Sequence, residues 1–489
     1  MFSATARLPH IVAGSLLSTL LAIASTGVAL GQNAPAVPNV PQEEAQEYRA
    51  LPPAEAAEEA SEETGPTRYL ESEFLTKRNI KTYGWVEAGI GANNWGTPFN
   101  GTITFDDRNW QLMMNQLYLV NEKLLDTSGG GWDWGGRVDL LYGTDYTYTT
   151  AAGLDAYNFD AVNAYFIPRW GSNKYYGLAM PQLYAELGYN DLAVKFGHFY
   201  TPIGYEVVPA VGNFFYTICD TFQYGEPFTH TGMLATWKAN DQLSILAGVV
   251  NGWDNWNSGT SLALPVNANY NNNAGFLGGV QMKSSDEAQS LSIMSYSGNM
   301  MNGIYAGPNA GSAINANRSY LSTVYVNKLS DKLTYVFQND NGWQFGLQDG
   351  MYTPTSGQGN NGLAQWYGLV NYLFYNFSDT LIGGMRFEYF RDNNGFRVFN
   401  PLRNLNWPAN ATYVNGPYQG NFWEITWGLN WLPTKNLRIR PELRYDWYTP
   451  DNYQPGDPLP YGGQVGRSPF GNGTQFGQFY GGCDAIWQF

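Results

Sequence analysis

The side chains best suited to act on solutes fall into two sets of opposite charge. The acidic set lies in residues 200–229, a segment rich in aromatic residues that has no Lys or Arg. Its members are Glu206, Asp220 and Glu226. The basic set consists of Arg386, Arg438, Arg440 and Arg444. Facing each other across a narrow aqueous passage, the two sets would create a field that orients dipolar solutes and filters ions. The alternative is an ordinary surface loop with scattered charges.

Catalytic and metal chemistry find little support in the chain. Beyond the N-terminal region the only histidines are His198 and His230, at the two ends of the acidic segment. Hydrogen bonding at the ends of that segment explains them better than a hydrolase triad does. No carboxylate at ligand spacing accompanies them. We therefore expect no catalytic residues, no metal and no cofactor, and we expect Cys219 and Cys483 to be unpaired.

The arginines must be positioned by β-strands, because charged and apolar residues alternate around them. In 437–448, apolar residues such as Leu437, Ile439 and Leu443 alternate with the arginines and acids. Side chains alternate between the two faces of a strand, so one face is apolar and the other is charged. In 437–448 this predicts that Glu442 and Asp446 also face a water-filled lumen. The same pattern in 132–145, 181–189 and 421–432 predicts further lumen-facing residues: Arg137, Asp139, Glu186 and Glu424.

A regular alternation of short turns and long loops organises the chain from Ile80 onward. Short polar turns recur about every 45 to 57 residues, for example at Asn190-Asp191, Ser330-Asp331 and Lys435-Asn436, and each step also holds a long loop rich in Gly, Asn and Pro. This asymmetry is typical of bacterial outer-membrane barrels. It predicts 16 strands, within a range of 14 to 18, near 80–92, 110–122, 132–145, 180–189, 192–199, 230–238, 242–252, 275–283, 289–296, 320–327, 332–341, 365–375, 380–391, 420–432, 437–448 and 475–489. In 110–122, 275–283 and 365–375 the alternation is too poor to assign the faces.

The C-terminal strand supports a closed barrel. Its last residues, Trp487-Gln488-Phe489, place aromatic side chains on one parity up to the end of the sequence. A terminal aromatic residue suits a strand that closes against the first strand at the membrane interface. A strand docked in a soluble sandwich is the alternative.

Composition agrees with a barrel but does not select it alone. Aromatic residues make up 16% of the chain and charged residues 14%, with 56 Gly. A barrel whose strands face lipid on one side and water on the other requires such a composition. A carbohydrate-binding β-protein would show it as well. After the first thirty residues no apolar run approaches the ~20 residues that a spanning helix needs.

The N-terminal part is expected to lie outside the barrel. Residues 1–31, with Arg7 followed by an apolar stretch, have the pattern of a secretory signal peptide cleaved after Gly31. Residues 32–79 are rich in Pro, Ala and Glu, and eight Glu between 43 and 63 accompany a single basic residue, Arg49. This composition predicts a disordered acidic tether, with a short helix around 54–63, that either is solvated or contacts periplasmic or wall components.

A family resemblance rests on residues 180–254. Motifs such as Gly197-His198-Phe199-Tyr200-Thr201-Pro202, Tyr224-Gly225-Glu226-Pro227-Phe228 and Asn251-Gly252-Trp253-Asp254 resemble the OmpL-like β-barrel porins, a family of planctomycete-type bacteria. The resemblance covers roughly 80–489. It implies an outer-membrane diffusion channel and does not define a solute.

The sequence thus predicts an all-β protein, a transmembrane antiparallel barrel with an infolded constriction loop, acting as a passive porin for small hydrophilic solutes and ions. A saccharide-selective channel of the same fold and a secreted soluble β-protein are the alternatives. Expected partners are membrane lipids and the diffusing solutes, with a homotrimer as a candidate assembly and no nucleic acid. From Ile80 onward 31 acids outnumber 21 bases, which favours a mild preference for cations.

Overall fold

The computed structural model describes residues 66–67, 69–70, 72–151, 153–160, 165–171, 175–256, 274–300, 316–347, 362–398, 418–451 and 468–489. The signal peptide and most of the tether, including the helix expected around 54–63, lie outside these residues. So do most residues of several long loops. No helix among the described residues has the length and apolar character needed to cross a membrane.

Sixteen antiparallel strands close into one barrel. In chain order they are β1 (Ile80–Asn93), β2 (Met113–Lys123), β3 (Trp132–Gly143), β6 (Gly177–Tyr189), β7 (Leu192–Tyr200), β8 (Thr229–Asn240), β9 (Leu243–Val250), β10 (Gly275–Lys283), β11 (Gln289–Met300), β12 (Ala316–Ser330), β13 (Leu333–Leu347), β14 (Gly362–Ser378), β15 (Leu381–Asp392), β16 (Gly420–Thr434), β17 (Leu437–Pro450) and β18 (Gly477–Gln488). Each strand pairs with its neighbours in sequence, apart from the β3–β6 pair and the closure of β1 on β18. The predicted strand count is confirmed.

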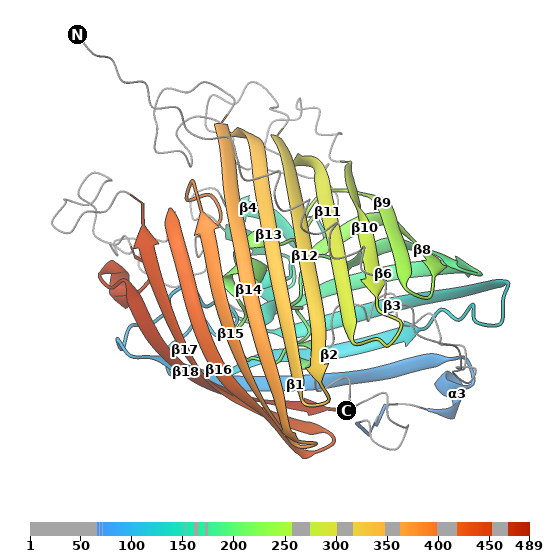
Figure 1. Cartoon of the computed structure of the whole chain (residues 1–489), viewed down its shortest axis with the longest axis horizontal. Helices are drawn as coiled ribbons and strands as arrows, with labels where there is room; N and C mark the ends of the chain where they lie inside the picture. Colours follow the sequence, from blue (N-terminus) through green and yellow to red (C-terminus); the bar gives the residue numbers. More distant parts are fainter. Residues whose placement is uncertain are drawn as a thin grey trace, which may run out of the picture. The chain divides into compact units, whose positions relative to one another are not determined.

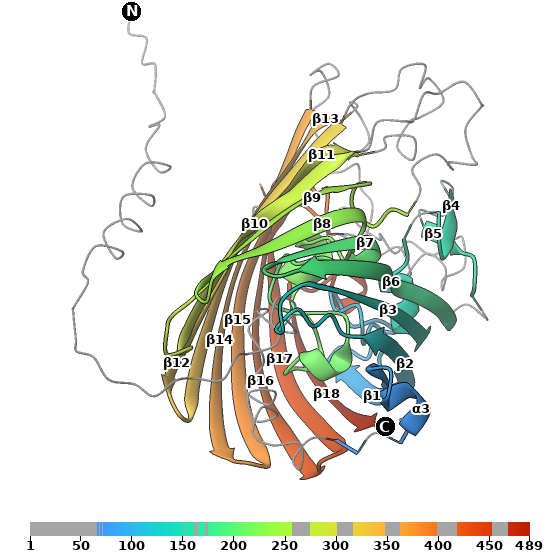
Figure 2. The same cartoon turned by 90° about the vertical axis from the view of Figure 1, so that its right-hand side faces the viewer.

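The long connection between β3 and β6 holds a hairpin that the sequence analysis did not predict. Its strands β4 (Ala156–Asp160) and β5 (Tyr165–Pro168) form a separate two-stranded sheet. Figure 2 shows this hairpin apart from the barrel wall.

Closure brings the two ends of the barrel sequence together. Trp85 lies opposite Gln488 and Gly91 opposite Gly482 in the β1–β18 register. At the rim, the Phe489 amide donates to the Gly84 carbonyl at 2.8 Å and the Gly84 amide donates back at 2.9 Å. The terminal aromatic residue therefore extends the last strand by one further backbone pair.

The faces of the clearest strands agree with the predicted alternation. In β17 the arginines and acids are buried toward the barrel interior, whereas Leu443 is 65% exposed on the outside. In β16, Trp427, Leu429 and Trp431 are exposed and Glu424 is buried. Since a charged side chain facing lipid at mid-bilayer costs ~2–4 kcal/mol, this separation of faces suits a membrane barrel.

The end of the segment predicted as a tether is ordered against the rim. A short helix, α3 (Glu73–Thr76), precedes β1. The Asn436 side chain exchanges hydrogen bonds with the Thr67 backbone at 3.0 and 3.2 Å, and Tyr69 stacks on Trp487 with ring centroids 6.1 Å apart. These contacts hold the chain beside the turn between β16 and β17 before it enters β1.

Candidate channel constriction

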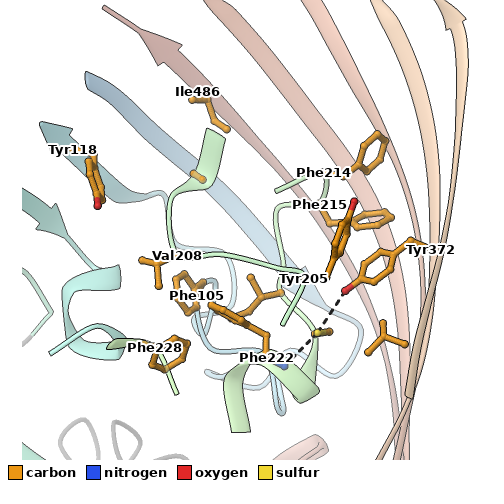
Figure 3. Packing of buried hydrophobic residues seen from close by; sticks show 14 of the residues in the cluster. Phe105, Tyr118, Tyr205, Val208, Phe214, Phe215, Phe222, Phe228, Tyr372 and Ile486 are labelled. Carbon is orange, nitrogen blue, oxygen red and sulfur yellow. Dashed lines mark hydrogen bonds between the residues drawn. The ribbon is translucent and has the colours of Figure 1, made fainter. Parts of the chain in front are cut away.

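The segment between β7 and β8, residues 201–228, folds into the barrel, and we call it the inner loop. Nearly all of its side chains are buried, including Phe214, Phe215 and Phe222. Figure 3 shows Phe214 and Phe215 beside Tyr372 of β14. The ring of Tyr205 also packs on the ring of Tyr372. The Tyr372 hydroxyl lies 3.7 Å from Cys219 Sγ, which also accepts from the Phe222 amide at 3.4 Å. Aromatic contacts therefore hold the loop against the wall.

Arg386 and Arg444 form the centre of the charged contacts between the inner loop and the wall. Arg386 on β15 pairs with Glu206 of the loop at 2.6 Å and with Glu424 of β16 at 2.5 Å. Glu424 also pairs with Arg444 of β17 at 2.6 Å. One carboxylate thus joins two arginines that are both fully buried. Hydrogen-bonded ion pairs of this kind are among the stronger polar contacts, and removing one partner leaves a buried charge.

Arg440 fixes the loop through its backbone. Its Nη1 donates to the carbonyl oxygens of Ala210, Asn213 and Phe215 at 3.1, 2.8 and 2.9 Å. Its other nitrogens pair with Asp484 at 2.6 Å and Glu87 at 2.9 Å. The two N–H groups of Nη1 are shared among the three carbonyls, and those of Nε and Nη2 point at the two carboxylates.

Carboxylates of the wall hold the loop's backbone amides. Glu442 accepts from the amides of Tyr216 and Thr217 at 2.9 and 3.2 Å. Glu388 accepts from the amides of Asp220 and Thr221 at 2.7 and 2.5 Å. Loop amides and carbonyls that would otherwise be buried without partners are satisfied by the wall.

The other predicted residues divide between this contact region and more distant places. Arg438 donates to the Val211 carbonyl at 2.8 Å, and Asp446 pairs with Arg444 at 2.7 Å. Asp220 lies 3.6 Å from Arg444. The Glu226 carboxylate accepts a hydrogen bond from Gln338 of β13.

The predicted residues on β3 and β6 lie apart from the inner loop's ion pairs. Arg137 pairs with Asp139 at 2.7 Å and with Glu122 at 3.1 Å. Glu186 lies opposite Lys195 of β7 in the strand register. These side chains face inward on another sector of the barrel.

One expectation about geometry was wrong. The sequence analysis placed the acidic segment and the arginines on opposite sides of a water-filled gap, whereas the structure joins them in direct ion pairs. An arginine side chain is long enough to reach the loop's carboxylates and carbonyls once the loop lies against the wall. The two charge sets therefore largely compensate each other.

Sequence reasoning missed several members of this contact region: Glu87, Glu388 and Asp484. Glu388 shares the parity of Arg386, and Asp484 lies on the polar parity of the last strand, so alternation alone could have identified both. A second infolded segment, 97–109, was also missed. Its Thr104 donates to Gln223 of the inner loop at 2.7 Å, and Tyr480 of β18 donates to its Asp106.

The inner loop is also tied at its ends. His230 of β8 contacts the Thr201 hydroxyl at 3.0 Å and the Gly252 carbonyl at 2.9 Å, as expected from hydrogen bonding at the loop ends. His198 instead contacts Thr231 at 2.8 Å. Both cysteines are free. Within the described residues no group of His, Cys, Asp and Glu is arranged to hold a metal ion.

Burial raises the pKa values of two acidic side chains that lie outside the strands. Burial raises the pKa of Asp220 to about 7, against the opposing influence of Arg444, and nearby Asp446 and Glu424 add to the rise. Burial likewise raises the pKa of Asp254, which follows β9, to about 6. These carboxyls therefore titrate near neutral pH rather than near pH 4.

A closed 16-stranded barrel with an apolar outside, a charged inside and an infolded loop defines the porin class of membrane channel. The family model described as "Putative beta-barrel porin-2, OmpL-like" matches residues 79–489. The chain belongs to this family, as its sequence motifs suggested. It is an outer-membrane protein of a bacterium, a channel for passive diffusion, and its family and fold are those of non-enzymatic channels.

The chain is similar to several solved structures. The anion-selective porin from Comamonas acidovorans has a TM-score of 0.50 at 10% identity, over 84% of this chain and 99% of that one. OprB of Pseudomonas putida has 0.49 at 11% identity over 88% and 100%, and the channel DcaP of Acinetobacter baumannii has 0.47 at 12% over 84% and 97%. No curated protein matches the chain.

Proposed function

We propose that the inner loop is a fixed constriction, and that solutes pass between it and the inward face of β8–β11. The observation that carries the proposal is the concentration of the loop's charged contacts on the β15–β17 side of the barrel. Arg386 and Arg444 form ion pairs with its acids, and arginines of β17 donate to its carbonyls. Hydrogen bonds from β2, β13 and β14 add to this attachment.

Exposure of the lumen wall supports the same path. Ser244 of β9 and Ser292 of β11 both lie opposite Gln281 in the strand register, on the inward face, and both are partly exposed. The register connects Ser292 through Val324, Gln338 and Val370 to Glu388 and Glu424. The wall of β9 and β11 is therefore partly exposed at Ser244 and Ser292, near the starts of these strands, whereas Glu388 and Glu424 of β15 and β16 are buried.

Charge in the constriction favours a mild preference for cations. Four arginines in the contact region, Arg386, Arg438, Arg440 and Arg444, accompany eight carboxylates: Glu87, Glu206, Asp220, Glu388, Glu424, Glu442, Asp446 and Asp484. A surplus of carboxylates beside a narrow aqueous path attracts cations. Because most of these groups are paired and buried, the preference is small.

The solutes are small, hydrophilic and chemically unselected, and the chain itself performs no catalysis. The interior aromatic rings around Trp253 and Trp366 are buried against one another and under Arg318 and Arg397. They offer no free ring face on which a sugar could stack, so the structure does not add support to a saccharide-selective channel.

Planar-bilayer recording tests the proposal. The triple variant Glu206→Gln, Asp220→Asn and Glu226→Gln should lose the cation preference in a salt-gradient reversal-potential measurement, and its single-channel conductance should change. A matched control neutralises three exposed acids of short turns: Asp191→Asn, Asp331→Asn and Asp379→Asn. Retained heat modifiability on gels verifies folding of both variants. If the folded triple variant keeps the selectivity of the unmodified protein, or the control shifts it more, the inner loop is not the constriction.

A further inference from the structure

The outer face of β11–β14 carries polar side chains where a lipid-facing wall should be apolar. On β13, Asn339 and Asn341 share the parity of Phe345, which is 47% exposed, whereas the alternate residues Gln338 and Asp340 are buried inside. The register continues this face to Thr323 of β12, opposite Asn339. We call the set Ser295, Thr323, Asn339, Asn341 and Asn371 the outer polar patch. Figure 1 shows its four strands side by side.

The patch lies between the two aromatic belts. Asn339 is four residues from Tyr335 on one side and four from Trp343 on the other, all on the outward parity. Asn371 of β14 is likewise midway between Tyr367 and Tyr375. Tyr and Trp mark the two membrane interfaces of such barrels, so these amides lie at the level of the hydrocarbon core.

The outward side chains of other strands between the aromatic belts are mostly apolar. On β16 the residues between Trp423 and Trp431 are Ile425, Trp427 and Leu429, and the outward residues of β17 are equally apolar. An outward amide does occur on β2, where Asn121 accepts from Thr82 of β1 at 2.8 Å. That is a single pair, whereas the outer polar patch extends over four neighbouring strands.

Contacts within the chain use only part of the patch's hydrogen-bonding capacity. Asn341 donates to Asn339 Oδ1 at 2.9 Å, and Asn339 donates to the Gly368 carbonyl at 3.1 Å. The Asn371 oxygen accepts from Tyr335 at 2.8 Å. A side-chain amide has two donor hydrogens and an acceptor oxygen. Among the contacts of the described residues, the two hydrogens of Asn371 and the oxygen of Asn341 have no hydrogen-bond partner, and lipid tails supply none.

We propose that the outer polar patch is the contact surface for a second copy of this chain, in a dimer with two-fold symmetry. Amides serve as donors and acceptors alike, so the patch is complementary to itself, which an isologous interface requires. The contact would give the spare donors and acceptors partners across the interface, as polar residues do between membrane segments. The surface lies on the barrel's exterior and is independent of the inner loop.

Cross-linking tests the contact directly. In a Cys483→Ser background, which removes the outward-facing native thiol, Asn339→Cys, Asn341→Cys and Asn371→Cys are introduced one at a time. At least one should form a disulfide-linked pair of chains on mild oxidation in native membranes. Leu429→Cys, exposed on the outer face of β16, is the matched control and should stay monomeric.

Mass measurement in mild detergent provides the second readout. The unmodified protein should have the mass of two chains, and the variant Asn339→Leu, Asn341→Leu, Asn371→Leu should have the mass of one while keeping heat modifiability and single-channel conductance. A one-chain or three-chain mass for the unmodified protein would overturn the proposal. So would a dimeric triple-Leu variant, or Leu429→Cys cross-linking as readily as the Asn variants.

Discussion

The two sides of the lumen differ in what their inward side chains do. On β15–β17 the arginines and acids are buried and hold the inner loop. On β8–β11 the described inward residues include Thr236, Ser244 and Ser292, which are uncharged and partly exposed, and Lys238, which lies opposite Ser244 in the register. The dense row of lumenal charges marks the wall that holds the inner loop. On our proposal, solutes pass on the other side of that loop.

The largest effect should follow from breaking the loop's attachment. Arg440→Met leaves Asp484 and Glu87 without their guanidinium partner and three loop carbonyls without a donor. Loss of one partner of a buried, hydrogen-bonded ion pair costs about 3–5 kcal/mol. Denaturant unfolding in detergent, followed by tryptophan fluorescence, should show this loss in the free energy of unfolding.

The matched control for this change is Arg391→Met. Arg391 pairs with Asp451 at 2.6 Å, but both side chains are about one-fifth exposed near the end of the barrel. Such a pair contributes roughly 0–1 kcal/mol. An Arg440→Met effect no larger than that of Arg391→Met would mean that the arginine contacts do not hold the loop.

A substitution on the inward face of β11 should change the single-channel conductance rather than the free energy of unfolding. Ser292→Arg adds a long cation to the partly exposed wall of β11, so we expect a roughly twofold fall in single-channel conductance and a shift of selectivity toward anions. Ser285→Arg, in the exposed turn before β11, is the control. If the two variants had the same conductance and ion selectivity, that result would contradict a solute path beside β11.

The smallest expected effect is a dependence on pH. Asp220, with its pKa raised by burial to about 7, is neutral below that pH and gains a negative charge above it. Cation preference should therefore rise between about pH 5.5 and about pH 8.5, and Asp220→Asn should reduce that rise. Since the folded pKa exceeds the unfolded value of about 3.9, this group's contribution to stability is complete below pH 4 and is lost as the pH rises through 7. If the cation preference of Asp220→Asn rose with pH as much as that of the unmodified protein, groups other than Asp220 would cause the rise.

Much of the barrel could be predicted from sequence because its strands are two-sided. The alternation of Arg438, Arg440 and Arg444 with Ile439 and Leu443 identifies both the strand and its inward face. Where alternation fails, the structure supplies the reason. In β14 the outward parity contains Asn371, and in β10 it contains Gly278, so neither strand presents a uniformly apolar outer face.

Distances between charges could not be predicted in the same way. Parity places Arg386 and Glu424 inside the barrel, and composition suggests that the segment around Glu206 packs on a wall. Neither says which wall. Contact or separation across water depends on where the loop's backbone finds partners, and those partners include Glu388 and Glu442 from strands about 160 to 240 residues away in sequence.

The central claim is that the inner loop narrows the channel, and single-channel conductance of a loop-shortened barrel tests it most directly. Residues 207–219 are replaced by a short Gly-Ser linker, and heat modifiability verifies that the barrel remains closed. A wider aqueous passage should raise the conductance severalfold over that of the unmodified protein, and larger neutral polymers should enter the pore. Unchanged conductance in the closed, shortened barrel would contradict the claim.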